Sequence, residues 1–185
     1  EMFGDPGRNP KKWPVQILGE LLISGPTNGL YKHKSAYGSG VPILRIDAFY
    51  DGVVRDIRAL KRVMVDESEL RRFSLSKNDI IINRVNSPEY LGKSAVVQSL
   101  TEPTVFESNM MRLTVNPDFL CSGYMIALLQ TKFAREHFLA NAKHAINQSS
   151  INQQDVKALQ IMLPPLVEQE HFEVQVESAK SIQSQ

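Results

Sequence analysis

The spacing of apolar residues changes at Pro117, and this change constrains the fold more than any other feature of the sequence. Before Pro117, apolar residues form short runs separated by turn-forming residues, a pattern typical of antiparallel strands. After it, apolar residues recur every three or four positions, as they do on one face of a helix. The sequence therefore predicts an α+β domain, with a twisted, mainly antiparallel sheet over 15–115 and packed helices over 117–158.

Local signals place the individual elements. Asp66 is a candidate N-cap for a helical turn, and Ser150 is a candidate cap for a short helix that runs to 158. Pro164 and Pro165 end a strand. We expect a short helix at 15–22, a turn at 25–29, a hairpin of strands 41–49 and 52–57, further strands at 63–65, 79–85, 95–97, 110–115 and 159–163, and two consecutive helices from 117 to 142.

The last segment of the sequence predicts a helix with a narrow apolar stripe. Phe172, Val176 and Ala179 follow a heptad-like spacing, and Glu, Gln and Ser cover the other positions. Such a stripe needs a partner, so we expect these three residues to contact a second helix; the alternative is a terminal helix that lies on its own domain. The chain then divides into a lead-in segment (1–14), a domain (15–164) and a truncated coiled-coil-type helix (165–185).

Composition is that of a globular domain outside the membrane. Hydrophobic residues make up 42% of the chain and charged residues 22%. No apolar run approaches the ~20 residues that cross a bilayer, and no signal peptide opens the sequence. The one cysteine, Cys121, cannot form an internal disulfide. We therefore expect a cytoplasmic protein without a membrane partner.

Charge permits contact with phosphates without requiring it. The net charge is only +1, but the segment 166–185 holds four glutamates and one lysine. The remainder carries 20 basic and 16 acidic side chains, a net of +4.

Motifs for catalysis are missing from the sequence. There is no Gly-rich phosphate or dinucleotide loop, and residues 86–90 differ from the Asn-Pro-Pro-aromatic motif of amino methyltransferases. Asp47 and Asp51 are not followed by the Glu-x-Lys of a nuclease. The four histidines lie far apart, without cysteine pairs between them. We therefore predict no catalytic residue, no metal and no cofactor.

Three polar loops carry isolated cations and are candidates for recognition. They span 27–38, 83–94 and 141–152. Lysines suit phosphates, arginine suits guanine, and Asn or Gln suits adenine. Solvated loops are the alternative, and Gln148 and Asn152 could instead cap a helix. The candidate DNA-contacting residues are Lys32, Lys34, Arg84, Lys93, Lys143, Asn147 and Gln148.

A series of short motifs, taken in order, resembles the target-recognition domain of type I restriction–modification specificity subunits. The series begins with the lead-in Met2–Trp13 and ends with Ile161-Met-Leu-Pro-Pro-Leu-Val-Glu-Gln169, which resembles the entry into the family's spacer helix. Between them stand Leu18-Gly-Glu-Leu, Gly40-Val-Pro-Ile-Leu-Arg-Ile-Asp47, Lys77-Asn-Asp-Ile-Ile81, Gly92-Lys-Ser-Ala95 and Gln148-Ser-Ser-Ile-Asn152.

The resemblance implies a non-catalytic domain that reads one half of a two-part target in double-stranded DNA. It implies methyltransferase subunits as partners, a restriction subunit in the full enzyme, and a second spacer helix. A complete subunit of this family has two recognition domains, so this sequence corresponds to a fragment or to a half-subunit that dimerises. The alternatives are a nuclease or modification domain that acts alone, and a protein-assembly adaptor without DNA binding.

Overall fold

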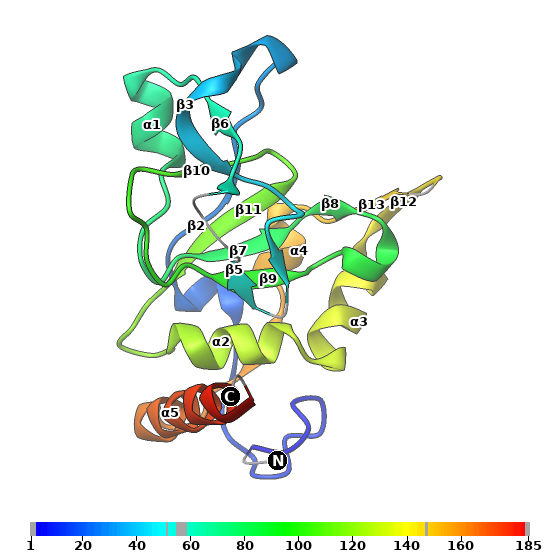
Figure 1. Cartoon of the computed structure of the whole chain (residues 1–185). Helices are drawn as coiled ribbons and strands as arrows, with labels where there is room; N and C mark the ends of the chain where they lie inside the picture. Colours follow the sequence, from blue (N-terminus) through cyan, green and yellow to red (C-terminus); the bar gives the residue numbers. More distant parts are fainter. Residues whose placement is uncertain (1–2, 51, 55–58, 147, 184–185) are drawn as a thin grey trace.

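A four-stranded antiparallel sheet lies at the centre of the molecule (Figure 1). The computed structural model describes residues 3–50, 52–54, 59–146 and 148–183. The sheet confirms the strands predicted at 79–85, 95–97 and 110–115. Its strands lie side by side in the order β2 (Leu22–Asn28), β11 (Met110–Val115), β7 (Ile80–Asn83) and β9 (Ser94–Val96).

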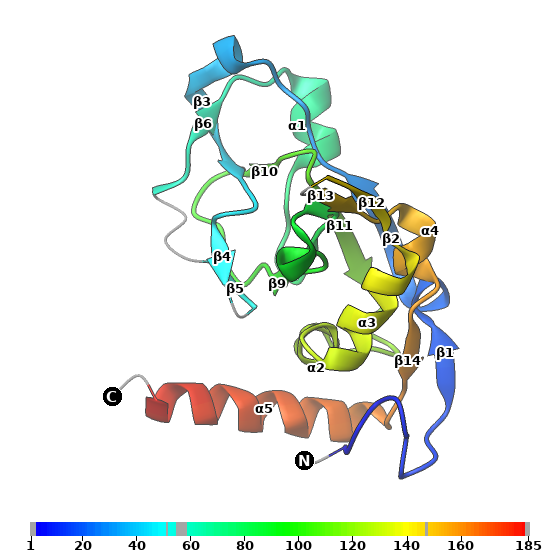
Figure 2. The same cartoon turned by 90° about the vertical axis from the view of Figure 1, so that its right-hand side faces the viewer.

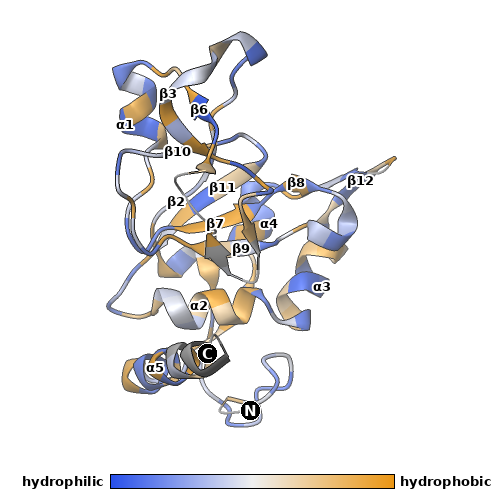
Figure 3. Ribbon diagram, in the orientation of Figure 1, coloured by the Kyte–Doolittle hydropathy of each residue, from blue (hydrophilic) through white to orange (hydrophobic). Residues whose placement is uncertain are grey.

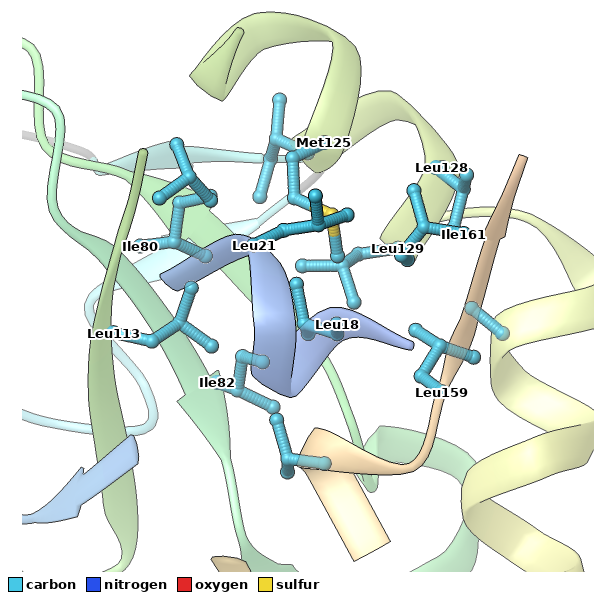
Figure 4. Packing of buried hydrophobic residues seen from close by; sticks show 14 of the residues in the cluster. Leu18, Leu21, Ile80, Ile82, Leu113, Met125, Leu128, Leu129, Leu159 and Ile161 are labelled. Atoms are coloured by element: carbon cyan, nitrogen blue, oxygen red, sulfur yellow. The ribbon is translucent and has the colours of Figure 1, made fainter. Parts of the chain in front are cut away.

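Strand β7 is buried on both faces because hydrophobic clusters cover the sheet from each side. Ile80 and Ile82 belong to the main core, which Figure 4 shows together with Leu18 and Met125. Ile81 belongs to a second cluster on the opposite face. The main core is covered by α2 (Ser122–Leu129), α3 (Lys132–Asn141) and α4 (Gln153–Lys157), which confirms the helical region predicted after Pro117.

A smaller lobe stands above the sheet in Figure 1 and has its own hydrophobic cluster. Asp66 caps its helix as predicted, because the Asp66 carboxylate accepts the backbone N–H of Glu69 and the Glu69 carboxylate accepts that of Asp66. The lobe contains β3 (Tyr37–Leu44), which pairs antiparallel with β6 (Arg62–Val63) and parallel with β10 (Val105–Phe106), and α1 (Glu67–Phe73).

The hairpin predicted from strands 41–49 and 52–57 is correct only at its turn, because residues 41–44 belong to β3, which pairs with β6 and β10 instead. β4 (Phe49–Tyr50) pairs antiparallel with β5 (Val53–Val54). The predicted second strand continued to residue 57, and residues 55–57 lie outside the described part of the chain.

The segment 141–152 contains two paired strands, where we predicted a loop. β12 (Lys143–Ala145) pairs with β13 (Gln148–Ser150), and β13 pairs with β8 (Val85–Asn86). Ser150 is therefore a strand residue, and the prediction that it caps α4 is wrong. Asn152 is the cap, since its side-chain oxygen accepts the backbone N–H groups of Gln154 and Asp155.

Two predictions in the first thirty residues are also wrong in part. Residues 15–17 form a strand rather than a helix, because β1 (Val15–Ile17) pairs with β14 (Gln160–Met162); only η1 (Leu18–Leu21) is helical. The expected turn at 25–29 lies mostly within β2. Gly25 has a φ of +86°, and a Cβ there would lie 2.5 Å from the carbonyl oxygen of Arg112. Gly25 thus marks a close approach to β11.

The C-terminal helix α5 (Leu166–Gln183) crosses below α2 (Figure 2). Its first turns are fixed to the domain by an aromatic cluster, in which Phe3 lies 5.2 Å from Trp13, 5.2 Å from Tyr124 and 5.0 Å from Phe172 between ring centroids. A helix is present where the sequence predicted one, whereas its coiled-coil character and its pairing with a second helix remain predictions. No helix within the described ranges is long and apolar enough to cross a bilayer.

Candidate nucleic-acid interface

Backbone hydrogen bonds link the three predicted recognition loops: two of them bond to one turn, residues 107–109, and the third bonds to the second. The carbonyl of Leu30, in the first loop, accepts the backbone N–H of Ser108 (2.9 Å). The carbonyl of Asn109 accepts the N–H of Arg84 (2.9 Å), in the second loop. The carbonyl of Arg84 accepts the N–H of Ile151 (2.9 Å), in the third. Segments far apart in the sequence therefore form one continuous surface.

A groove of about 680 Å³ lies on the first-loop side of this surface. Four basic side chains line it, together with Tyr31, whose side chain is 78% exposed. The four basic residues are Lys32, Lys34, Arg45 and Lys61. Their positions come from both sides of β3: η2 (Lys34–Ala36) precedes it, Arg45 follows it, and Lys61 directly precedes its partner β6. The pairing of β3 with β6 thus brings Lys34, Arg45 and Lys61 to the same groove.

Two of the four cations already have carboxylate partners. The Lys32 ammonium lies 2.7 Å from a carboxylate oxygen of Glu69 on α1. Arg45 Nε lies 3.5 Å from Glu107, which is buried and also accepts the backbone N–H of Ile46. These contacts fix the orientation of Lys32 and Arg45 at the groove wall while leaving both side chains partly exposed. Lys34 and Lys61 are exposed.

Arg84 stands between the groove and the hairpin. Its Nη1 donates a hydrogen bond to the carbonyl of Ser108 (3.1 Å), so the guanidinium is oriented by the turn at 107–109. Its Nε is buried and has no hydrogen-bond partner within the protein. Buried donors are normally satisfied, so the Nε of Arg84 is an exception among the buried polar atoms of the described residues.

Lys93 points inward. Its ammonium donates to the carbonyl of Ile46 (2.7 Å) and lies 4.9 Å from the ring centroid of Phe49 and 5.5 Å from that of Tyr90. Its role toward DNA stays a prediction, and the contacts found here hold the loop before β9 against β4.

The hairpin carries the third-loop candidates. Lys143 and Gln148 are exposed and belong to cross-strand pairs on the same face, Lys143 with Ser150 and Gln148 with Ala145. His144 and Ser149 occupy the other face, where His144 Nδ1 and Ser149 Oγ are 2.9 Å apart. Asn147 lies outside the described residues.

Arg45 and Lys61 were missed by the sequence interpretation, although the sequence holds a signal for one of them. Residues 21–46 contain no aspartate or glutamate, and neither do residues 137–154. These two carboxylate-free stretches include Arg45 and the whole hairpin. Lys61 lies outside them, and only the pairing of β3 with β6 places it at the groove.

The stripe on α5 is divided between the domain and solvent. Phe172 packs against Phe3 and Tyr124, so this residue has a partner within the chain. Val176 is half-buried and Ala179 is exposed. Among the described residues there is no group of three or more His, Cys, Asp and Glu side chains that could hold a metal ion.

An α+β domain with a basic surface built from separate loops can now be compared with known proteins. Residues 10–181 match the family model of the type I restriction modification DNA specificity domain, and the chain belongs to this family.

Relatives of this chain are specificity subunits by name. The chain is 33% identical over 167 residues, 90% of its length, to the chain named as the MjaX specificity subunit of Methanocaldococcus jannaschii, and covers 39% of that protein. It is 30% identical to the EcoKI specificity subunit of Escherichia coli, with 85% of the chain matched and 34% of the relative covered. The chain therefore spans little more than a third of the length of these relatives.

Solved structures confirm the fold. The HsdS subunit from Thermoanaerobacter tengcongensis superposes with a TM-score of 0.66 at 19% identity, covering 95% of this chain and 44% of that one. The S subunit from M. genitalium gives a TM-score of 0.63 at 17% identity, covering 92% of this chain and 39% of that one.

Proposed function

We propose that this chain is a non-catalytic domain that reads one half of a bipartite target in double-stranded DNA. The observation that carries the proposal is the linkage of three separate, cation-bearing segments: the first two bond to the turn at 107–109, and the third bonds to Arg84 of the second. Family membership supports the same function, since the matched model is that of a DNA specificity domain.

The surface divides into two kinds of contact. Lys32, Lys34, Arg45 and Lys61 line a groove and serve phosphates, which position the domain without reading sequence. Arg84 and Gln148 serve base edges, because a guanidinium fork suits guanine O6/N7 and an amide suits adenine N6/N7. Lys143 shares a face of the hairpin with Gln148 and contacts a phosphate or a base edge. A single module of this kind buries roughly 600–1,000 Å², so the isolated domain binds weakly.

The assembly is part of the proposal. In the cytoplasm the chain acts with methyltransferase subunits and, in a full restriction enzyme, with a restriction subunit. α5 pairs with a second spacer helix, either in the same longer subunit or in a homodimer. Since Phe172 is engaged within the domain, Val176 and Ala179 are the stripe residues that remain accessible for this pairing.

Salt titrations separate positioning contacts from reading contacts. Lys34→Ala is expected to weaken binding to all duplexes alike and to lower the slope of log K against log salt by about one unit. Arg84→Ala is expected to cost roughly 1–3 kcal/mol and to relax preference at one base pair. Fluorescence anisotropy on duplexes of cognate and scrambled sequence measures both effects.

Two control variants sharpen this experiment. Arg84→Lys keeps the charge without the planar fork, so it should retain nonspecific binding and still lose the base preference. Arg8→Ala removes an exposed cation from the lead-in segment, far from the groove, and should leave both quantities unchanged. Wild-type affinity that is independent of salt would contradict the proposal, and so would cleavage or methyl transfer by the purified chain with Mg²⁺ and S-adenosylmethionine.

A further inference from the structure

The hairpin β12–β13 ends in an apolar side chain that the protein leaves in solvent. Ile146 is 94% exposed, more than any other large hydrophobic residue among those described. β13 is anchored to β8 only through Ser149 and Ser150, so the end of the hairpin around Ala145 and Gln148 extends beyond its supporting strand. Figure 1 shows this end projecting from the body, and Figure 3 shows the apolar colour at its tip.

The surroundings of Ile146 favour a polyanion over an apolar protein groove. Residues 137–154 contain no aspartate or glutamate, whereas the hairpin carries Lys143 and His144. The base of the hairpin joins β8, and Arg84 directly precedes β8. A strand pair without carboxylates can therefore pass between two phosphate backbones without charge repulsion.

The dimensions of the hairpin select the groove. Paired strands lie about 4.8 Å apart, and side chains extend the ribbon on both faces. A two-stranded ribbon fits the major groove of undeformed B-DNA, which is about 12 Å wide, whereas the minor groove of about 6 Å would have to be opened to admit it. On the floor of the major groove, the apolar group that a base edge presents is the 5-methyl group of thymine.

We propose that Ile146 reads a thymine by contacting its 5-methyl group from the tip of the hairpin in the major groove. This inference rests on the proposed function, because it requires that the hairpin side of the basic surface faces DNA. It adds an apolar reader to the polar contacts of Arg84 and Gln148, and it identifies a position that selects against cytosine and uracil.

Removing the methyl group from the DNA and the side chain from the protein tests the contact from both sides. The target half-site is first selected from a random duplex pool with the wild-type chain. Each thymine on either strand is then replaced singly by deoxyuridine, which removes only the 5-methyl group. The wild-type chain is expected to bind one substituted duplex about fourfold more weakly, the factor for one buried methyl group.

Ile146→Ala is expected to bind the thymine duplex more weakly and to show no difference between thymine and deoxyuridine at that position. Ile146→Val keeps branched methyl groups and should retain most of the difference. Val174→Ala, an exposed apolar residue on α5 at the far end of the molecule, is the matched control and should retain all of it.

The outcomes separate the two proposals. If the wild-type chain selects a sequence but tolerates deoxyuridine at every position, the methyl contact is refuted and the proposed function stands. If one position is sensitive and Ile146→Ala keeps the full sensitivity, another residue reads the methyl group and the inference is again wrong. If the chain selects no sequence and binds without salt dependence, the proposed function itself fails.

Discussion

Gln169 connects the helix α5 to the domain through three hydrogen bonds. Its Nε2 donates to the carbonyls of Phe119 (3.0 Å) and Pro164 (2.8 Å), and its Oε1 accepts the backbone N–H of Cys121 (3.0 Å). The residue is fully buried. This explains the last residue of the Pro-Pro-Leu-x-Glu-Gln motif in structural terms, since the amide satisfies backbone groups at the start of α2 and just before α5.

Replacing Gln169 with leucine should therefore destabilise the fold. The substitution leaves two carbonyls and one N–H without partners, each worth about 1–3 kcal/mol when buried, and a loss of about 3 kcal/mol or more in the free energy of unfolding is expected. Urea denaturation measures it. Gln175→Leu, at an exposed position of the same helix, should stay within about 0.5 kcal/mol of wild type. Equal effects of the two substitutions would show that the hydrogen bonds of Gln169 contribute little.

The thiol of Cys121 should be unreactive in the folded protein. Burial, with Glu173 and Glu170 nearby, raises the pKa of Cys121 to about 11. Against an ordinary thiol, this lowers the thiolate fraction at pH 8 by roughly a hundredfold. Because the raised pKa favours the protonated form, the stability from this group is present below the ordinary thiol pKa and is lost as the pH rises toward 11.

Alkylation of the chain's one cysteine with iodoacetamide measures this prediction directly. The folded chain should react slowly at pH 8 and faster as the pH rises, whereas the chain in guanidinium should react at the rate of a free thiol. A folded-state rate that matches the denatured rate would disprove the pKa shift.

At the scale of elements, α1 holds one of the cations of the groove without lining the groove itself. Glu69 caps the helix and also binds Lys32. Phosphate must compete with this carboxylate for Lys32. The helix therefore lowers the affinity of the groove while it fixes the position of the lysine.

Glu69→Gln should tighten binding to any duplex, because glutamine keeps the cap and removes the competing charge. We expect a gain between roughly 1.5- and fivefold, the range that partly exposed ion pairs are worth, and a steeper salt slope by up to about one unit. Glu67→Gln is the control. It makes the same change in net charge next to the cap residue Asp66, but the carboxylate that it removes pairs with Arg71 rather than with Lys32. If both variants tighten binding equally, only the net charge matters and the contact with Lys32 does not.

The elements that the sequence predicted well have a signal within their own residues. Asp66 and Glu69 form a capping box, and the apolar spacing after Pro117 is sufficient to indicate α2 and α3. The elements missed depend on partners elsewhere. The strands at 143–145 and 148–150 carry polar side chains on both faces, and we attribute their pairing to the edge that β8 offers. Val15 is in a strand because it pairs with Met162, which lies far along the chain.

The residues of the candidate site also divide into those with a local sequence signal and those that depend on distant partners. Lys32, Lys34 and Arg84 stand out in the sequence because they are cations in loops rich in Gly and Asn. The sequence could not show that Lys61 joins them, since that requires the register of β3 against β6. Nor could it show that Lys93, also in a polar loop, donates its ammonium to Ile46 inside the fold.

At the scale of the whole molecule, α5 has to serve the domain and an external partner at once. Val176→Asp places a charge in the accessible part of the stripe, so it should weaken self-association and the binding of methyltransferase subunits without unfolding the domain. Sedimentation velocity and co-purification measure the two effects. Glu170→Asp, an exposed change on the same helix, should alter neither. Unchanged assembly in Val176→Asp would mean that α5 only covers its own domain.

The pairing of β1 with β14 has a consequence for the time at which the domain completes its fold. Val15 leaves the ribosome long before Met162, its cross-strand partner. At 5–20 residues per second, the first strand waits roughly 7–30 s for the last. During this interval the backbone of β1 and the apolar side chains of Leu18 and Leu21 lack the neighbours that Leu159 and Ile161 later supply. The domain therefore closes only after β14 has emerged, so α5, which follows β14 directly, is already synthesised when the sheet is completed.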